Sequence, residues 1–365
     1  MSEHLQSAKA AWHAYVDEVR AQLEPRVPEF IRPLAKQFSD QGGGTFRMLS
    51  PLRSEKTPSF FAYEGRGWFD FGTNEGGDGL KFIRDFYKCS FRDAVDRGAE
   101  FCGVQTWDER KKGLFGGSGA QSPTPAELEE MWNVSAERSR AFDAMTALQH
   151  VAWALKPKAV HDHLRNHYGL TDQFIDFEKI GYVPAGFWEI VSEPFVAGSL
   201  GDPDGPNPYY LLDRFTKEDL ISTGWFHVAN RGESISPIFS TRIVFPYWDR
   251  AQCVYAIGRQ YFGKATKEQT TLEDWDSGKY KKLPLFDPKK HPYISPHLKN
   301  ALYGVDTIGN SRDGTLVITE GMTDAQMLAQ LGFAVISPIT VTFPKVTSKS
   351  CVRCSSLRRF RASSS

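Results

Sequence analysis

The sequence lacks an excess of charge of either sign, because its 365 residues carry 44 Lys and Arg against 44 Asp and Glu. A global basic field that attracts nucleic acid is thereby excluded, and any such contact must come from local patches. The sequence also lacks an apolar run as long as a membrane span, and residues 1–12 lack the apolar segment of a signal peptide. We therefore expect no membrane partner.

Cysteine is scarce as well. The five cysteines are scattered and form no disulfide framework, so we expect a reducing, cytoplasmic setting. Cys351 and Cys354 make a single CxxC, which without a second pair is weak evidence for zinc. What is present suits folded domains: 41% hydrophobic and 13% aromatic residues can form buried cores, and the length allows two or three domains.

Residues 315–340 carry the most informative pattern: a short apolar run, a turn, a helix-like segment and a second apolar run. This order predicts a βαβ unit with parallel, buried strands. Glu320 follows the first strand at its carboxyl end, where open α/β sheets bind ligands, and Asp324 falls in the first helical turn. Two carboxylates there suit Mg²⁺ in a protein that handles phosphates. A helix-dipole preference and a solvated loop residue would explain the same two acids.

The N-terminal part reads as helices, then strands, then helices again. Residues 5–38 predict two packing helices, the second at Glu29–Phe38. Short β-like runs separated by turns follow, and after them the pattern returns to helical. The predicted strands are Thr45–Met48, Ser59–Tyr63 and Trp68–Phe71, and the predicted helices are Gly79–Phe86 and Phe91–Cys102.

Residues 50–104 contain EKTPSF at 55–60, FG at 71–72 and GGD at 76–78, followed by Phe82 and the helix from Phe91. In this order and spacing the segment resembles the zinc-ribbon domain of bacterial-type, DnaG-like DNA primases. That family holds zinc with one Cys and one His near the first strand turn and two Cys near the second. The corresponding residues here are Ser50, Arg53, Asp70 and Thr73.

None of these four residues is a good zinc ligand, and Arg53 cannot be one because a guanidinium stays protonated. We therefore predict a zinc-ribbon-like module without zinc. Ribbons this small usually need a staple, so we expect the module to rely on its own core, with Trp68, Phe69 and Phe71, and on the N-terminal helices.

Three further motifs lie between residues 164 and 304. They are YGL at 168–170 with IGYVP at 180–184, RIVFPYWD at 242–249 with Gly258-Arg259, and LYG at 302–304. They resemble the RNA-polymerase core of the same primases, and the middle one predicts two strands around a turn at Asp249–Gln252. The Asn-Ser that follows a Lys-Tyr in the family is not preserved after residues 279–282. His163 and His167 have a metal-compatible spacing without a third ligand, so we expect surface histidines.

Cations in this region alternate with aromatic residues such as Tyr255, Tyr261 and Phe286. Cations neutralise phosphates and aromatic faces stack on bases, which is the combination of a groove for single-stranded nucleic acid. A solvated basic face is the alternative. The predicted nucleic-acid- or nucleotide-binding residues are Lys56, Arg242, Arg259, Lys279, Tyr280, Lys281 and Lys282.

The motif ITEGMTDAQ at 318–326 resembles the opening of the Toprim fold, which these primases share with type IA and type II topoisomerases. The resemblance implies that Glu320 acts as general acid/base or metal ligand, with Asp324 as a second acid and Mg²⁺ as cofactor. It also implies synthesis of short RNA primers from ribonucleotides on a single-stranded DNA template, with a replicative helicase as a further partner.

A Toprim site also needs a later Asp-x-Asp pair, yet no Asp or Glu follows Asp324. We therefore expect an incomplete Mg²⁺ site and little or no polymerisation by this chain alone, as for a truncated or frame-shifted gene. One alternative is an inactive single-strand-binding or regulatory remnant. Another is a different Toprim enzyme, such as a topoisomerase or nuclease, against which the motifs before residue 310 argue.

The expected fold class is α+β with an α/β part: a degenerate zinc-ribbon-like β module and a primase RNA-polymerase core that ends in a partial Toprim βαβ unit. The predicted divisions are N-terminal helices (1–40), the ribbon-like module (41–106), a linker (107–128), the first part of the polymerase core (129–310), the start of the Toprim domain (311–340) and a basic, Ser-rich tail, expected to be disordered (341–365).

Overall fold

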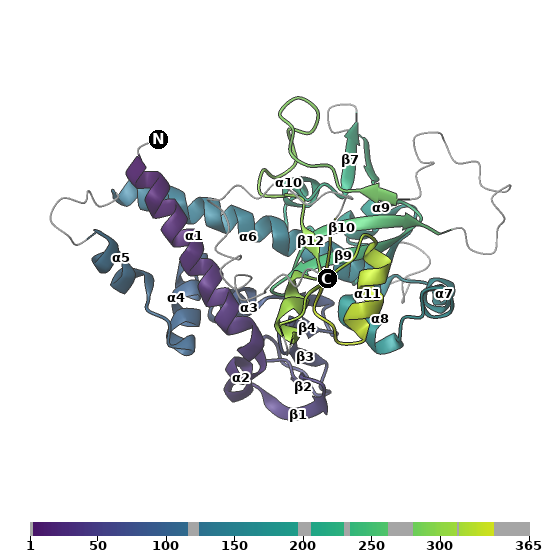
Figure 1. The fold of residues 1–365 in the computed structure, drawn as a ribbon, viewed down its shortest axis with the longest axis horizontal. Helices are drawn as coiled ribbons and strands as arrows, with labels where there is room; N and C mark the ends of the chain where they lie inside the picture. The colour runs from purple at the N-terminus through teal and green to yellow at the C-terminus, as the bar shows by residue number, and fades with distance from the viewer. Residues whose placement is uncertain are drawn as a thin grey trace. The chain divides into compact units, whose positions relative to one another are not determined.

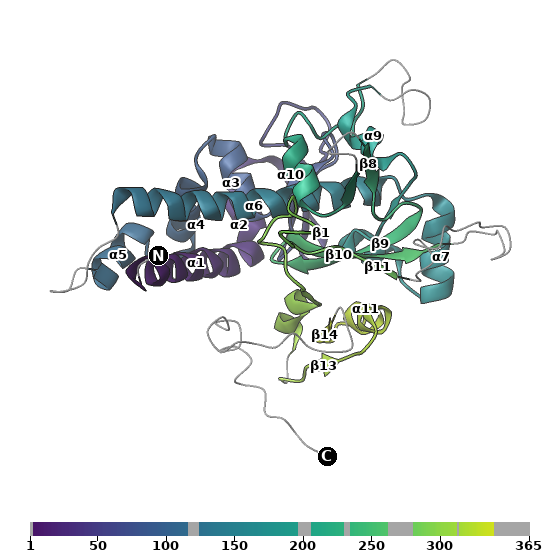
Figure 2. The ribbon, with the colours of Figure 1, turned by 90° about the horizontal axis from the view of Figure 1, so that it is seen from above.

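The chain is a mixture of helices and antiparallel and parallel strands (Figures 1 and 2). It divides into two compact units, residues 1–143 with 250–252 and residues 144–249 with 253–365, and each unit is described by itself. This division does not test the domain boundaries expected from the sequence, which stay predictions. The computed structural model describes residues 3–115, 124–195, 206–229, 234–261, 280–311 and 314–338.

The first unit begins with a long helix, α1 (Glu3–Leu23), which buries Trp12 and other residues of one face. Three short helical turns follow: η1 (Glu24–Arg26), α2 (Val27–Ile31) and η2 (Arg32–Leu34). The predicted helix Glu29–Phe38 is therefore too long. Its last residues open strand β1 (Lys36–Gly42), because the backbone of this segment pairs with the next strand rather than with itself.

The ribbon-like module is a five-stranded antiparallel sheet in sequential order, β1 to β5. Two helices follow it, α3 and α4, capped at their N-termini by the side chains of Asp78 and Ser90. The strands and helices predicted here are confirmed within two residues at each end. Their bounds are β2 (Thr45–Leu49), β3 (Phe60–Tyr63), β4 (Gly67–Asp70), β5 (Glu75–Gly77), α3 (Gly79–Tyr87) and α4 (Phe91–Cys102).

One core joins this sheet to the N-terminal helices, as expected for a small module that needs support. Trp68 stacks on Phe60 at 5.2 Å, and the same buried cluster includes Trp12 of α1. Phe69 is buried, but Phe71 is 42% exposed, so the expectation that Phe71 fills the core is wrong. It lies just past β4, in the turn before β5.

Part of the predicted linker 107–128 is helical. Helix α5 (Trp107–Phe115) begins with a buried tryptophan whose ring lies 5.1 Å from that of Trp12, which anchors the segment. Residues 116–123 lie outside the described part of the chain. Helix α6 (Pro125–Ala154) follows.

The second unit contains a four-stranded antiparallel sheet in the order β11-β10-β9-β6. Its central hairpin turns at Arg250 and Ala251, which have positive φ, and this confirms the hairpin predicted around residues 249–252. A smaller hairpin pairs β7 with β8. The bounds are α7 (Lys158–Tyr168), α8 (Asp172–Glu178), β6 (Gly181–Val183), α9 (Phe187–Ser192), α10 (Lys217–Ser222), β7 (Phe226–Ala229), β8 (Ser234–Pro237), β9 (Arg242–Asp249), β10 (Gln252–Gln260) and β11 (Tyr280–Lys282).

The βαβ unit predicted for residues 315–340 is present. Strands β13 (Val317–Ile318) and β14 (Val335–Pro338) are parallel, with helix α11 (Met322–Gln330) between them, and β14 also pairs with β12 (Leu302–Tyr303). Strand β14 is buried throughout, whereas Ile318 in β13 is 58% exposed. The expectation of two buried strands is thus half right, because β13 is an edge strand among the described residues.

Hydrogen bonds attach this βαβ unit to the helices before the four-stranded sheet. The side chain of Gln330, the last residue of α11, accepts from the backbone N–H of Thr171 at 2.6 Å and donates to the carbonyl oxygen of Gly169 at 3.2 Å. On the other side, the Tyr303 hydroxyl donates to Glu178 at 3.2 Å. Helix α11 and strand β12 are therefore both attached to this part of the second unit.

Candidate nucleic-acid and metal sites

Glu320 and Asp324 lie where the sequence predicts them, at the carboxyl end of β13 and in the first turn of α11, and both are exposed. The turn between them is held by two hydroxyls: Thr319 donates to the carbonyl of Gly321 at 3.0 Å, and Ser337 donates to the carbonyl of Glu320 at 3.3 Å. A Cβ at position 321 would lie 2.7 Å from Oδ2 of Asp324, so glycine leaves room for that carboxylate.

Carboxylate oxygens are the hard ligands that Mg²⁺ prefers, so the donor type of Glu320 and Asp324 fits this ion. Within the described ranges, no group of three or more His, Cys, Asp or Glu side chains gathers to hold a metal ion. The roles of Glu320 and Asp324 as catalytic acids and Mg²⁺ ligands therefore stay predictions.

A cation between two aromatic rings marks the second predicted feature. The guanidinium of Arg259 on β10 lies 4.8 Å from the ring centre of Tyr168 and 5.2 Å from that of Tyr280, and it donates to the Tyr280 hydroxyl at 2.8 Å. Arg259 and Tyr280 are cross-strand partners in the pairing of β10 with β11. Since all three side chains are half-buried or exposed, cation and ring faces are held together at the surface.

Further rings extend this feature. Tyr261 lies 6.3 Å from Tyr182 of β6 and 5.2 Å from His163 of α7, measured between ring centres. Burial raises the pKa of Tyr168 to about 12. Burial lowers the pKa of His163, and the electrostatic influence of His167 and Arg259 acts in the same direction. We call the set Tyr168, Tyr182, Arg259, Tyr261 and Tyr280 the tyrosine–arginine surface.

Sequence reasoning found Arg259, Tyr261 and Tyr280 but did not assign Tyr168 and Tyr182 to binding. Both lie in motifs noted for their resemblance, YGL and IGYVP, but only the folded chain brings Tyr168 of α7 against Arg259 and Tyr182 of β6 against Tyr261. Tyr255, which the pattern suggested as a stacking residue, is 1% exposed and donates its hydroxyl to the carbonyl of Leu283 at 2.9 Å. It belongs to the core.

The other predicted contact residues are dispersed. Arg242 starts β9 and is only 1% exposed, so we do not assign it a nucleic-acid contact. Lys281 is half-buried and Lys282 is exposed beside Tyr280 in β11, while Lys56 is exposed in the first unit. Lys279 lies outside the described residues, as do the tail 341–365 and its CxxC.

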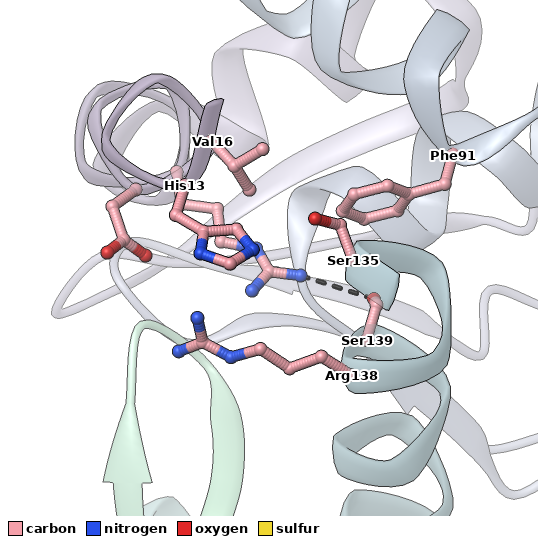
Figure 3. Close-up of a pocket in the computed structure, with 8 residues that line it drawn as sticks. His13, Val16, Phe91, Ser135, Arg138 and Ser139 are labelled. Carbon is pink, nitrogen blue, oxygen red and sulfur yellow. Dashed lines mark hydrogen bonds between the residues drawn. The ribbon is translucent and has the colours of Figure 1, made fainter. Parts of the chain in front are cut away.

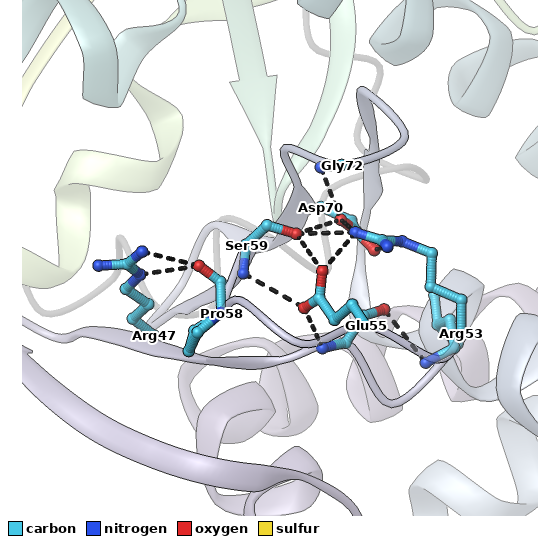
Figure 4. A network of polar contacts seen from close by, with 9 residues as sticks. Arg47, Arg53, Glu55, Pro58, Ser59, Asp70 and Gly72 are labelled. Carbon is cyan, nitrogen blue, oxygen red and sulfur yellow. Dashed lines mark hydrogen bonds and ion pairs between the residues drawn. The ribbon is translucent and has the colours of Figure 1, made fainter.

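Two of the four predicted zinc-ligand positions, Arg53 and Asp70, are joined by charged hydrogen bonds (Figure 4). Arg53 donates from Nε and Nη2 to the two oxygens of Asp70, at 3.1 and 2.9 Å, and from Nη2 to Glu55 at 2.6 Å. Glu55 in turn accepts from the backbone N–H of Ser50 at 2.6 Å. Thr73 is exposed, and its N–H bonds the carbonyl of Asp70 at 3.2 Å.

The two acids of this network are stabilised in their charged form. Burial raises the pKa of Asp70, but hydrogen bonds from Arg53, Ser50 and the N–H of Gly72 outweigh it and leave the pKa lowered. Burial also raises the pKa of Glu55, but hydrogen bonds from Ser59 and Ser50 outweigh burial and leave the pKa lowered. A permanent cation with two carboxylates offers none of the thiolate or imidazole donors of a structural zinc site, so zinc does not fit here.

A shallow pocket opens in the first unit between α1, α4 and α6 (Figure 3). Arg20 crosses it, donating to Ser139 at 3.2 Å and pairing with Asp78 at 3.2 Å. Its volume, about 270 Å³ including open solvent, is below the roughly 300–1,000 Å³ of small-molecule sites. We assign it no ligand.

Comparison with known protein families gives a match for the ribbon-like module. Residues 33–113 match the CHC2 zinc-finger family of DnaG ribbons. Beyond that segment, the chain is 25% identical to the DNA primase of Pasteurella multocida over 333 residues, which cover 90% of this chain and 48% of the relative. It is also 25% identical to the DNA primase of Borreliella burgdorferi over 229 residues, 62% of this chain and 39% of the relative.

Among solved structures, the zinc-binding and RNA-polymerase domains of the Aquifex aeolicus primase cover 89% of this chain and 66% of that one, with 17% identity and a TM-score of 0.47. A DnaG primase catalytic domain bound to single-stranded DNA covers 56% of this chain and 57% of that one, with 19% identity and a TM-score of 0.37. TM-scores below 0.5 do not establish a shared fold.

These matches show a CHC2-type ribbon segment at residues 33–113. Outside residues 33–113, the chain is similar to DnaG-type bacterial DNA primases at about one residue in four. It spans about half the length, or less, of the relatives it matches first. No helix in the described residues is long and apolar enough to cross a membrane.

Proposed function

We propose that this chain takes part in the synthesis of short RNA primers on single-stranded DNA. The tyrosine–arginine surface holds the template, and Glu320 with Asp324 forms the first part of a Toprim-type acidic site. The arrangement of Arg259 against the rings of Tyr168 and Tyr280 carries the proposal, because it offers a cation for a phosphate and ring faces for bases at one place.

Bound Mg²⁺ would neutralise phosphate charge during phosphoryl transfer. Glu320 and Asp324 would hold it from the carboxyl end of β13 and the N-terminal turn of α11, where the helix dipole also favours an anionic substrate. The later acids of a Toprim site are not supplied by residues 325–365, which contain no Asp or Glu. Polypeptide 1–365 by itself is therefore proposed to make little or no primer.

A primer-synthesis assay tests both parts of this proposal. Polypeptide 1–365 is incubated with Mg²⁺, ribonucleotides and a single-stranded template, beside a chimera in which residues 1–338 are followed by the corresponding later part of the Pasteurella multocida primase. We expect Glu320-dependent primers from the chimera and none above background from polypeptide 1–365. In the chimera, Glu320→Gln should lower the rate at least about 100-fold.

Primer synthesis by polypeptide 1–365 that Glu320→Gln abolishes would show that its acids suffice. Failure of a folded chimera to make primers would favour the second candidate, a non-catalytic single-strand-binding or regulatory protein. The arrangement of Arg259 against the rings of Tyr168 and Tyr280 is the observation that favours that candidate, because binding of a single strand there needs no acid. Ribonucleotide and helicase partners are proposed from the primase family alone.

A further inference from the structure

The two loops of the ribbon-like module are joined by side chains at the positions where related ribbons bind metal. We propose that the guanidinium of Arg53 takes the place of the zinc ion: it cross-links the loop after β2 to the end of β4, and the module folds without a metal. This role is independent of primer synthesis and concerns the stability of the first unit.

The geometry of the network matches the task of a cross-link. Arg53 lies in the loop between β2 and β3, and its two donor atoms grip both oxygens of Asp70, the last residue of β4. Nη2 also donates to Ser59 Oγ at 2.8 Å, just before β3 begins. One planar group therefore ties together three segments of the sheet, as a tetrahedral ion ties together ligands from two loops.

Glu55 closes the network from the other side. Its Oε1 accepts the backbone N–H groups of Ser50 and Ser59, at 2.6 and 3.2 Å, and its Oε2 accepts the hydroxyl of Ser59 at 2.6 Å. The loop 50–59 is thus folded around a carboxylate that itself contacts the guanidinium. Thr73, the fourth ligand position, adds only a backbone turn to Asp70.

The space that the guanidinium occupies depends on Gly72. A Cβ there would lie 1.7 Å from Arg53 Nη2 and 3.0 Å from Ser59 Oγ. The backbone N–H of Gly72 also donates to Asp70 Oδ1 at 2.8 Å. Glycine at this position lets the turn after β4 close directly over the charged group.

Charge and burial distinguish this network from an ordinary surface ion pair, which contributes little to the stability of a fold. The side chains of Asp70 and Glu55 are 2% and 7% exposed, and that of Arg53 is 31% exposed. One guanidinium and two carboxylates carry a net charge of minus one. Zinc with three thiolates and a neutral imidazole carries the same charge, so the substitution preserves the charge that the fold must accommodate.

Metal content and thermal unfolding of the full chain test the proposal. A Cys351→Ser/Cys354→Ser background prevents the CxxC pair from contributing metal. In that background we expect no stoichiometric zinc and no change of Tm with EDTA. A four-site reversion, Ser50→Cys, Arg53→His, Asp70→Cys and Thr73→Cys, should bind one zinc per chain and lose thermal stability when EDTA is added.

The charge network is tested separately with Arg53→Met, which leaves Asp70 and Glu55 buried without their cation. Arg47→Met is the matched control, because Arg47 of the same module donates to the neutral carbonyl of Pro58, at 3.0 and 2.8 Å, and lies 5.9 Å from the ring centre of Phe61, and it forms no ion pair with the described residues. We expect Arg53→Met to lower the Tm of the first unit by roughly 5–15 °C, and Arg47→Met by less than half of that.

Stoichiometric zinc in the Cys-to-Ser protein, or a Tm that falls with EDTA, would overturn the proposal. Equal Tm losses in Arg53→Met and Arg47→Met would also overturn it, even if the reversion variant fails to fold. Zinc binding by the reversion variant would show that the ribbon geometry is retained, and the difference between the two Met variants would show what now maintains it.

Discussion

Two pairs of buried acids in the first unit respond to pH in opposite directions. Asp70 and Glu55 have lowered pKa values in the fold, so their stabilising effect is present above their unfolded pKa values, near 4, and is lost as the pH falls through the folded values. Burial, with the charge of Asp78 nearby, raises the pKa of Glu24, and burial also raises that of Asp78. The surroundings of each acid, rather than its residue type, determine whether its pKa is raised or lowered.

Glu24 gives a prediction of its own. Its Oε1 accepts the N–H of Gly79 at 2.7 Å, while its Oε2 has no hydrogen-bond partner among the described residues. Because its folded pKa is raised, the fold favours the protonated acid, and stability falls as the pH rises from about 4 to the folded pKa. Glu24→Gln should therefore raise the free energy of unfolding at pH 8 by on the order of 1 kcal/mol, measured by denaturant titration.

The variant should also flatten the dependence of stability on pH. Glu29→Gln serves as control, because Glu29 has a 60% exposed side chain and pairs with Arg26. A Glu24→Gln protein that is less stable than the wild type at pH 8, or whose stability changes with pH as steeply as before, would contradict the assignment.

At the scale of elements, the sequence predicted those that carry a clear local signal. Apolar periodicity or turn residues predict the hairpin β9–β10, the helices α3 and α4, and the βαβ unit. Strand β1 was missed because Lys36–Gly42 is exposed almost throughout and has no apolar alternation; only pairing with β2 makes it a strand. The exposure of β13 was missed for a similar reason, since edge position is a property of the sheet.

Gly304 shows an element-scale constraint that the motif LYG did not explain. It joins β12 to the short helix η6 (Val305–Asn310) with φ of 80°, and a Cβ there would lie 2.1 Å from the carbonyl oxygen of Val335 in β14. That oxygen also accepts from the hydroxyl of Thr307 at 3.0 Å, so it cannot move without losing a bond. The backbone can pass β14 here only if residue 304 has no side chain.

We predict that Gly304→Ala costs about 2–4 kcal/mol of unfolding free energy, the sum of backbone strain and a backbone clash. Gly314→Ala is the matched control: Gly314 has a φ of 82° but nothing within 4 Å of the added Cβ. It should cost only about 1 kcal/mol. Urea titrations of both variants measure the difference, and equal losses would show that the approach to β14 is not tight.

At the scale of the whole molecule, a net charge of zero leaves nucleic-acid binding to local surfaces. The sequence predicted Arg259, Tyr280 and Arg242 alike as binding residues, but Arg242 is buried. Periodicity cannot separate these arginines, since both lie in β-strands with aromatic neighbours. The difference arises from tertiary structure: the pairing of β10 with β11 sets Tyr280 beside Arg259, and helix α7 brings the ring of Tyr168 to 4.8 Å from the same guanidinium.

Binding of a single-stranded oligonucleotide at several salt concentrations tests this local assignment. If Arg259 neutralises one phosphate, Arg259→Ala should weaken binding and reduce the slope of log K against log salt by about 0.7–1. Tyr280→Ala should weaken binding by about 1–3 kcal/mol through lost stacking and leave the slope nearly unchanged.

Arg165→Ala is the control, because Arg165 is an exposed cation of the same unit that already pairs with Asp172 at 3.1 Å. If Arg165→Ala reduced the slope as much as Arg259→Ala, binding would depend on diffuse positive charge. The aromatic partners of Arg259 would then be irrelevant, and the tyrosine–arginine surface would not be the template site.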